Sequence, residues 1–314
     1  TVVASVIHIF VFQMYVIPSS SMEGTLLVGD YLYVSKVTYG PQMPNTPISF
    51  PFVHHTMPFS KTGAKSYSEA IQRPYHRLKG LRKIERDDIV VFNFPAGDTV
   101  LLENQAVTYY DVLRDYQRQY GEQRGRKLLE ESHTIISRPV DKRENYIKRC
   151  VAVAGDSIRI VDAQLYVNGE KQTDLPESQL CYTVRTSSPL SSYALQNLGI
   201  SELSSNGNHY FMPLTEGMVA ELSKMSSVKS ITPYRAMEQA FPYSDNYPWT
   251  ADNFGPLWIP QKGVTIPLTV DNLPLYERII DVYEENDLRV EGSDIYINGE
   301  KATTYTFKMD YYWM

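Results

Sequence analysis

Hydrophobic and polar positions alternate along much of this 314-residue chain, a pattern typical of β-strands with one buried face. Strand patterns occur at residues 26–37, 87–95 and 146–153. Residues 107–131 differ, because their apolar side chains recur at steps of three and four with charged residues on the opposite face. We therefore predict a mainly β fold that carries one helical insertion on its surface.

A repeat follows in the second half of the chain. IRIVDAQLYVNGEK at 158–171 is echoed by LRVEGSDIYINGEK at 288–301. Both contain Asn-Gly, which favours the type I′ turn of a two-residue hairpin. We predict two similar hairpins, which are either a true duplication or two separate hairpins of one kind. Residues 172–287 between them are predicted to form an inserted α+β subdomain, after which 288–314 return to the β domain.

The chain begins in an apolar run, 2–17, interrupted only by Ser5, His8 and Gln13. The run is slightly shorter than the ~20 residues that span a bilayer. We predict that residues 1–17 are part of a transmembrane helix that anchors the protein. A signal peptide fits less well, because no basic segment precedes the run and no small-residue cleavage site follows it. A buried core helix is the remaining alternative.

A proline-rich loop occupies residues 39–60, where five prolines alternate with apolar side chains. Proline excludes this segment from a helix interior and from a central strand. The apolar tip of the loop is expected either to pack on the body of the protein or to dip into lipid. Residues 68–86, which follow, are basic and polar and are expected to lie on the surface.

Composition narrows the function only in part. Apolar residues make up 43% of the chain and charged residues 21%, which is typical of a folded protein with a packed core. The net charge of -6 argues against a nucleic-acid partner, because such proteins usually neutralise phosphates. Two cysteines, Cys150 and Cys181, allow one disulfide at most and no zinc quartet.

Three consecutive serines after Pro18 raise the question of a nucleophile. A serine hydroxyl needs a base to remove its proton, and none of the six histidines has a recognisable catalytic context. A lysine in an apolar strand is the other candidate base, because burial lowers the pKa of its ammonium group. Lys148, in YIKRCVAV, is such a lysine, and strand alternation places it on the same face as Tyr146.

Three motifs together resemble those of the type I signal peptidases. IPSSSMEGTLLVGDYLYVSK is similar to the family's P-S-x-S-M-x-P-T-L nucleophile segment, and RDDIVVFNFP to its R-G-D-I-V-V-F strand. YIKRCVAVAGD is similar to its K-R-x-x-G-x-P-G-D lysine segment. The motifs follow the apolar start in the family's order, and the resemblance covers about residues 9–98 and 145–171. The inserted length is similar to that of signal peptidases from the Bacteroidetes group.

The resemblance implies a role for each matching residue. Ser21 would be the nucleophile, Lys148 the general base, and Ser19 would form the oxyanion hole with the Ser21 backbone N–H. The residues implied to contact substrate are Ile17, Pro18, Met22, Leu26, Tyr146 and Ile147.

The resemblance also implies a fold and a reaction. Residues 18–171 would form a signal-peptidase-like antiparallel β catalytic domain, which cleaves exported preproteins after small residues through an acyl-enzyme. No metal or cofactor is implied. The expected partners are signal peptides and the lipid bilayer, with the secretion machinery as a candidate, and the expected location is the outer face of the bacterial inner membrane.

Departures from the family pattern leave the reactive groups in place. Gly24, Asp87, Ala152 and Ala154 stand where the family usually has Pro, Gly, Gly and Pro. The family's late G-D-N-R-x-x-S-x-D-S-R segment, which orients the lysine, is not found before Met314, so we expect a fragment cut at both ends. The alternative functions are a Ser-Lys autoprotease and an envelope protein that binds signal peptides without cutting them.

Overall fold

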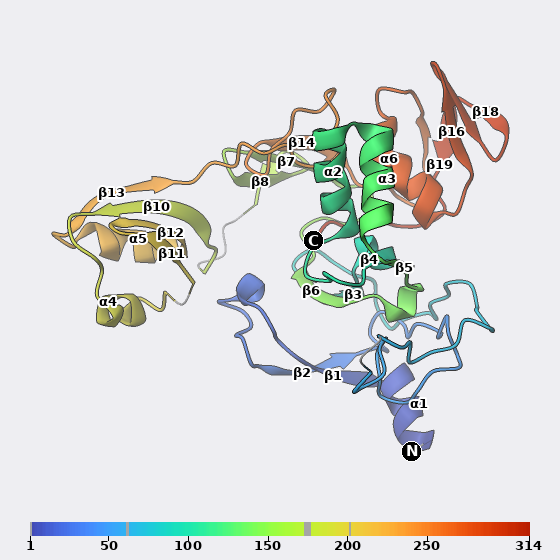
Figure 1. Cartoon of the computed structure of the whole chain (residues 1–314), viewed down its shortest axis with the longest axis horizontal. Helices are drawn as coiled ribbons and strands as arrows, with labels where there is room; N and C mark the ends of the chain where they lie inside the picture. The colour runs from blue at the N-terminus through green and yellow to red at the C-terminus, as the bar shows by residue number, and fades with distance from the viewer. Residues whose placement is uncertain (1, 61–62, 173–176, 201) are drawn as a thin grey trace. The chain divides into compact units, whose positions relative to one another are not determined.

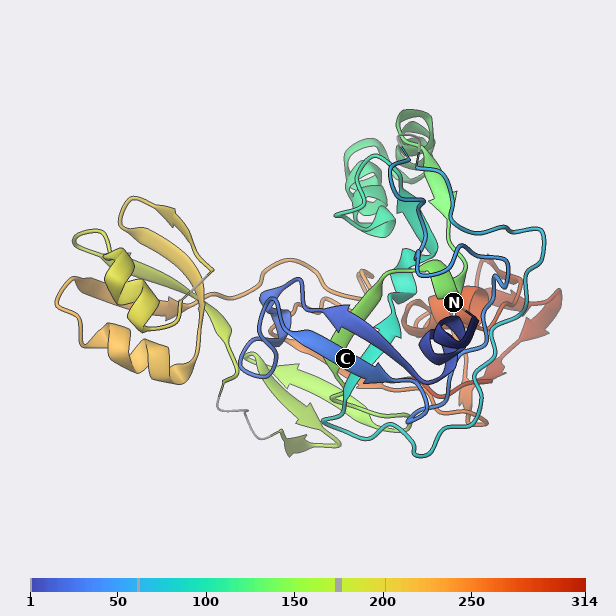
Figure 2. The ribbon, with the colours of Figure 1, turned by 90° about the horizontal axis from the view of Figure 1, so that it is seen from below.

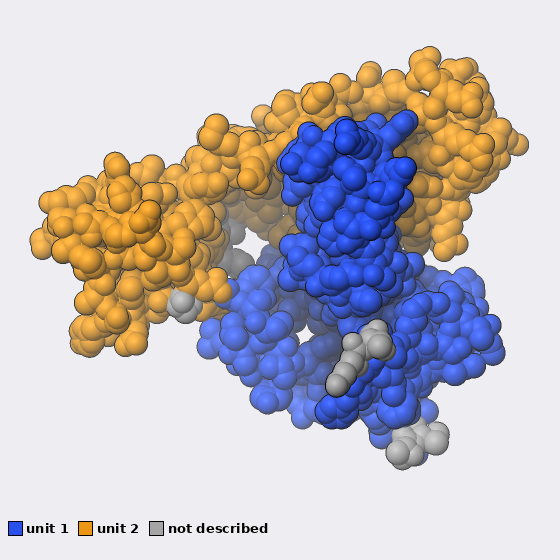
Figure 3. Space-filling view, viewed as in Figure 1, with its two compact units in different colours: residues 1–22, 26–150 blue, residues 23–25, 151–314 orange. Residues whose placement is uncertain are grey.

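The computed structural model of the chain describes residues 2–60, 63–172, 177–200 and 202–314 (Figure 1). The chain forms two compact units (Figure 3). Unit 1 contains the residues up to Met22 together with 26–150, and unit 2 contains 23–25 and 151–314. The strand pairs in the described ranges are all antiparallel, which confirms the predicted mainly β class.

The apolar start of the chain is only partly helical. Helix α1 spans Val2–Phe10, and strand β1, Phe12–Val16, then pairs with β2, Tyr31–Ser35. The prediction of a helix over residues 1–17 is therefore wrong in its extent, because the backbone of β1 bonds to another strand instead of to itself (Figure 2). No helix in the described part of the chain is both long and apolar enough to cross a bilayer.

The three serines lie between β1 and β2, where a short 3₁₀ helix, η1, spans Ser20–Met22. Strand β2 begins at Tyr31, later than predicted. The reason is a turn, in which Gly29 has a φ of 92° and the Asp30 carboxylate accepts a hydrogen bond from the Leu27 N–H at 2.8 Å.

Strands β3, Ile89–Asn93, and β6, Asn145–Arg149, form a two-stranded sheet in unit 1. The two predicted strands are thus confirmed; both are shorter than predicted, and β6 begins one residue earlier. Their register places Val90 opposite Lys148 and Phe92 opposite Tyr146. The other short elements of this region are η2, Pro95–Asp98, the paired strands β4, Thr99–Leu101, and β5, Ile135–Ser137, and η3, Val140–Lys142.

The helical insertion is two helices where one was predicted. Helix α2 spans Tyr109–Tyr120 and α3 spans Glu122–Ser132. Gly121 separates them with a φ of 82°, a conformation that a helix cannot continue through and that glycine adopts without strain. Buried Leu113 and Leu129 join the two helices in one apolar cluster, so the insertion is an amphipathic helical hairpin.

The predicted hairpin repeat is confirmed in unit 2. The first copy contains β7, Ser157–Val161, β8, Gln164–Val167, and β9, Glu170–Lys171; the second contains β16, Leu288–Glu291, β17, Asp294–Ile297, and β18, Glu300–Ala302. Asn168 and Asn298 each have a φ of 53° before a glycine at 84°, as a type I′ turn requires. Each asparagine side chain also accepts a backbone N–H, from Ser157 and Asp287 respectively. The two hairpins thus share the same turn contact.

Between the hairpins lies a four-stranded sheet with its own core. The elements are β10, Leu180–Thr186, α4, Ser192–Asn197, β11, Ser204–Asn206, β12, His209–Leu214, α5, Glu216–Ser223, and β13, Val228–Pro233. The βαββαβ sequence and the strand order β11-β12-β10-β13 are those of a ferredoxin-like, or split βαβ, fold. Helices α4 and α5 cover one face of the sheet (Figure 1), where Val184, Met212 and Leu222 are buried.

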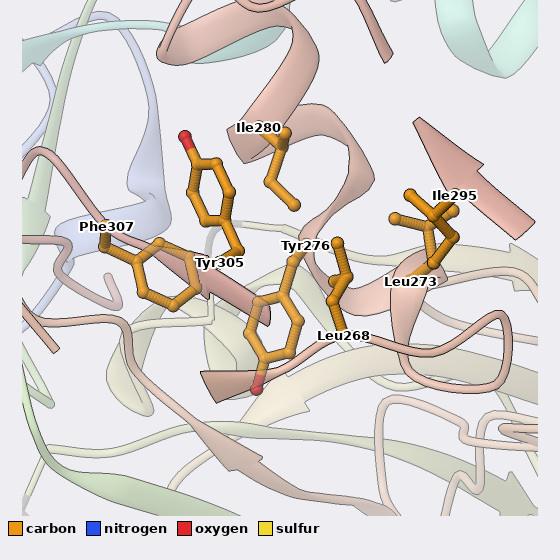
Figure 4. Packing of buried hydrophobic residues seen from close by; sticks show 7 residues of the cluster. All are labelled: Leu268, Leu273, Tyr276, Ile280, Ile295, Tyr305 and Phe307. Carbon is orange, nitrogen blue, oxygen red and sulfur yellow. The ribbon is translucent and has the colours of Figure 1, made fainter. Parts of the chain in front are cut away.

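The other strands of the predicted 172–287 segment pair with strands on either side of that segment. Strand β14, Phe254–Trp258, joins β7, and β15, Thr265–Pro267, joins β19, Thr304–Thr306. Helix α6, Leu273–Arg278, continues into the π-helical turn η4, Ile279–Tyr283. Figure 4 shows the core around these elements, in which Phe307 is 1% exposed and lies among the rings of Tyr276 and Tyr305.

Replacing Phe307 by alanine is expected to destabilise unit 2 by about 3–5 kcal/mol, because the substitution removes a buried ring and leaves a cavity. The loss is measured from urea unfolding of the full-length protein. Phe59→Ala makes the same chemical change at a fully exposed position and should alter the free energy of unfolding by less than about 0.5 kcal/mol. Equal effects of the two substitutions would contradict this account of the core.

Candidate active site

Ser21 and Lys148 are in direct contact within unit 1, although 127 positions separate them in sequence. The Lys148 ammonium donates a hydrogen bond to the Ser21 hydroxyl. Ser21 lies in η1 with its side chain exposed, while its neighbour Met22 is buried and fixes the turn to the unit. The short helix thus exposes the Ser21 hydroxyl, while the buried Met22 side chain holds it in place.

The Lys148 side chain is half-buried on β6. Its cross-strand neighbour on the same face is Val90, which is only 4% exposed. Burial lowers the pKa of Lys148 from its ordinary value, because the ammonium form loses solvation beside this apolar surface. No carboxylate in the described part of the chain forms an ion pair with Lys148 to oppose this effect.

A second serine hydroxyl lies beside that of Ser21. The Ser19 hydroxyl lies 3.4 Å from that of Ser21, and the Ser19 side chain is exposed. The geometry therefore puts the Ser19 hydroxyl next to the hydroxyl that contacts lysine.

Histidines serve other contacts in the described structure. The His54 ring bonds to the Arg143 carbonyl at 2.8 Å, and His55 bonds to Glu144 at 2.9 Å. Ser21 hydrogen-bonds to no histidine among the described residues. Lys148 is therefore the basic side chain that the fold places in contact with Ser21.

A groove of about 840 Å³ lies in unit 1 beside these elements. Leu26 and Ile147 line it, together with Tyr15, Leu32 and Val91. Four further residues implied to contact substrate do not line it: Ile17 and Met22 are buried, at 3% and 8% exposure, and Pro18 and Tyr146 are exposed. Their roles as substrate contacts stay predictions.

The Tyr146 side chain packs against another aromatic ring. Its ring stacks on that of Phe94, with centroids 4.4 Å apart, on the same strand face as Lys148. Val90 is the neighbour of Lys148 that residue-by-residue reasoning missed. The strand containing Val90 was recognised in the sequence, but only the β3–β6 register decides which of its side chains faces the lysine.

Comparison with known proteins identifies the family of this chain. A family model described as "Signal peptidase, peptidase S26" matches residues 1–212, more than half of the chain. The chain belongs to this signal peptidase family. The match includes Ser21 and Lys148, and it extends past residue 171 into the segment where we found no motif of the signal peptidases.

Two curated members of the signal peptidase family illustrate the degree of similarity. Signal peptidase I of Rickettsia prowazekii is 23% identical over 172 residues, 54% of this chain and 40% of that protein. Signal peptidase I of Helicobacter pylori is 31% identical over 134 residues, 38% of this chain and 41% of that protein. The chain thus spans less than half the length of these relatives. No solved structure matches it significantly.

Proposed function

We propose that the protein is a membrane-bound serine endopeptidase that removes signal peptides from exported preproteins. The contact between the Lys148 ammonium and the Ser21 hydroxyl is the observation that carries this proposal. Family membership supports the same reaction class. The proposed place of action is the outer face of a bacterial inner membrane.

In the proposed mechanism, Lys148 acts in its neutral form. Its amine accepts the proton of the Ser21 hydroxyl while Ser21 Oγ attacks the carbonyl carbon of the scissile bond. The resulting ammonium then gives the proton to the leaving amine as the carbon–nitrogen bond breaks. Water, deprotonated by the same lysine, hydrolyses the serine ester and releases the new carboxyl end, and Ser21 recovers its proton.

The developing oxyanion needs hydrogen-bond donors. Ser19 is proposed to supply its hydroxyl, because its Oγ lies 3.4 Å from Ser21 Oγ and its side chain is exposed. The backbone N–H of Ser21 is proposed as the second donor. Each such donor is typically worth ~3 kcal/mol of transition-state stabilisation.

An apolar surface in unit 1 supports action at a membrane. The outward-facing residues of the β1–β2 hairpin are largely apolar and exposed, among them Met14 at 63%, Tyr31 at 80% and Tyr33 at 74%. A contiguous patch of this kind in a soluble domain usually marks an interaction site. Tyrosines suit a membrane interface because the ring is apolar and the hydroxyl is polar.

A probe at Met14 is therefore expected to report lipid. We would label Met14→Cys with an environment-sensitive fluorophore in a Cys181→Ser background, since Cys150 is buried. In vesicles, spin-labelled phospholipid should quench this probe strongly. The same label at Tyr193→Cys, an exposed position in unit 2, should be quenched much less. Equal quenching at both positions would remove the support for a membrane-facing hairpin.

Cleavage of an exported preprotein by the full-length protein tests the proposed function directly. Purified protein incubated with an exported preprotein should release a fragment ending after a small residue, identified by mass spectrometry. Binding of signal peptides without any cleavage would favour the alternative, a non-catalytic envelope protein. Cleavage confined to the protein's own chain would favour a Ser-Lys autoprotease.

A further inference from the structure

Lys36 lies where the β1–β2 hairpin meets the end of α1. It directly follows β2, and its backbone N–H donates to the carbonyl of Val11, the first residue after α1, at 2.9 Å. Its side chain lines the groove of unit 1. No acceptor for its ammonium group is found in the described part of the chain.

A second cation lines the same groove near Lys36. Arg77 is held to the segment that follows β2, because its Nη1 donates to the Gly40 carbonyl at 2.7 Å and its Nε to the Tyr75 hydroxyl at 3.1 Å. The pKa of Lys36 is lowered to about 8, first by burial and then by the charge of Arg77. Two cations that repel each other in a half-buried groove form a site complementary to an anion.

Another lysine in the groove helps to show what is unusual about Lys36. Lys142 is only 7% exposed, and burial lowers its pKa although the charge of Asp141 opposes this effect; its ammonium lies 5.4 Å from the centroid of the Tyr67 ring. Lys142 is therefore partly compensated by its neighbours. The titratable side chains that act on Lys36 are Arg77 and the His8 ring of α1, and neither is an acid, so we place the anion at Lys36.

Apolar surface adjoins this cationic end. Met14 and Tyr33 line the groove and also belong to the exposed apolar face of the hairpin. Helix α1 exposes further aliphatic side chains, including Val3 and Val6. A ligand that matches both parts has an anionic group and long apolar chains, as a phospholipid does.

We propose that Lys36 and Arg77 bind the phosphate group of a membrane phospholipid, whose acyl chains lie along the exposed apolar residues of the hairpin and α1. The proposal rests on the proposed function in one respect, the location at a membrane. The proposal adds a lipid-binding site to a groove for which the proposed function requires only peptide binding. Lys36 and Arg77 hold the headgroup and take no part in the chemical step.

Calorimetric titration of the full-length protein in a neutral detergent tests the site. The probe is short-chain phosphatidylglycerol, and a Ser21→Ala background removes peptide cleavage from the experiment. Lys36→Gln should weaken binding about tenfold or more, because a charge-assisted hydrogen bond is lost. Lys83→Gln, which removes the same charge from an exposed position in the same unit, should leave affinity within about twofold.

Two matched probes identify the ligand. Short-chain diacylglycerol lacks the phosphate and should bind much more weakly than phosphatidylglycerol. Inorganic phosphate lacks the acyl chains and should also bind weakly. If phosphate binds as tightly as the lipid, the site is one for a free anion and the lipid assignment fails. If diacylglycerol binds as tightly, the cations have no role and the proposal fails.

The pH dependence gives a readout that a merely structural lysine would not show. Below the pKa of about 8, Lys36 carries its proton and binds phosphate without further uptake. Above it, binding requires proton uptake, so affinity should fall as pH rises. Lys36→Arg, which stays charged, should bind lipid with an affinity that is flat over this range. If the lipid affinity of the unsubstituted protein does not change with pH over this range, the proposal fails.

The lipid site and the proposed function fail in different ways. A protein that binds phosphatidylglycerol through Lys36 but cleaves no preprotein retains the lipid site and loses the peptidase. A protein that cleaves preproteins but binds lipid equally well with Lys36→Gln retains the peptidase and loses the site. Circular dichroism of each variant, with Lys36→Arg as the conservative substitution, separates lost binding from lost folding.

Discussion

Ser21→Ala is expected to abolish preprotein cleavage by the full-length protein, with a loss of about 10⁴-fold or more in kcat. The substitution removes the hydroxyl that contacts Lys148 and leaves the rest of the short helix η1 unchanged. Cleavage is measured from the rate of appearance of the mature fragment. Circular dichroism and thermal unfolding show whether the variant keeps its fold.

The neighbouring serines provide the controls for this experiment. Ser20→Ala should leave cleavage largely intact, since Ser20 stands at the variable position of the nucleophile motif. Ser19→Ala should slow cleavage by about 10²–10³-fold, as expected for loss of one oxyanion donor. An inactive Ser20→Ala protein with an active Ser21→Ala protein would show that the assigned nucleophile is wrong.

Lys148→Arg is expected to be as damaging as loss of the nucleophile, although it keeps a positive charge. A guanidinium group does not lose its proton in a protein, so it cannot accept the proton of Ser21. The matched control is Lys83→Arg, the same exchange at an exposed position of unit 1, which should be nearly silent. Near-normal cleavage by Lys148→Arg would exclude lysine as the base.

The pH profile of the unsubstituted enzyme extends the same prediction. Burial beside Val90 lowers the pKa of Lys148 below that of a free lysine. Since the neutral amine is the active form, kcat should rise with pH through this lowered pKa and level off below the ordinary lysine value of 10.5. A rate that levels off only at the pKa of an exposed lysine would contradict a desolvated base.

Several features of the chain could be predicted from its sequence because their causes are local. The two Asn-Gly turns adopt positive φ at Asn168 and Asn298, as neighbouring residues alone dictate. The strands β3 and β6 follow from alternating apolar positions. The serine and lysine motifs indicated the family to which the chain belongs. Local sequence also supplied Ser21 and Lys148 as the candidate pair of reactive side chains, and the structure brings them into contact.

Tertiary structure decided what depends on distant partners. An apolar run does not itself choose between helix and strand; residues 12–16 form a strand because 31–35 pair with them. The helical spacing of apolar residues continues across Gly121. The positive φ of Gly121 nevertheless ends the first helix, and a second helix begins at Glu122. The neighbour of Lys148 is Val90 only through the β3–β6 register, which no local pattern encodes.

The groove illustrates the same division between local and distant causes. Family motifs named six residues as substrate contacts, yet only Leu26 and Ile147 line the groove that the structure forms. Ile17 and Met22 are buried instead, because packing against the rest of the unit sets the depth of each side chain. The sequence alone determined which reactive groups the protein carries; packing and strand register, set by residues far apart in the chain, determined what surrounds them.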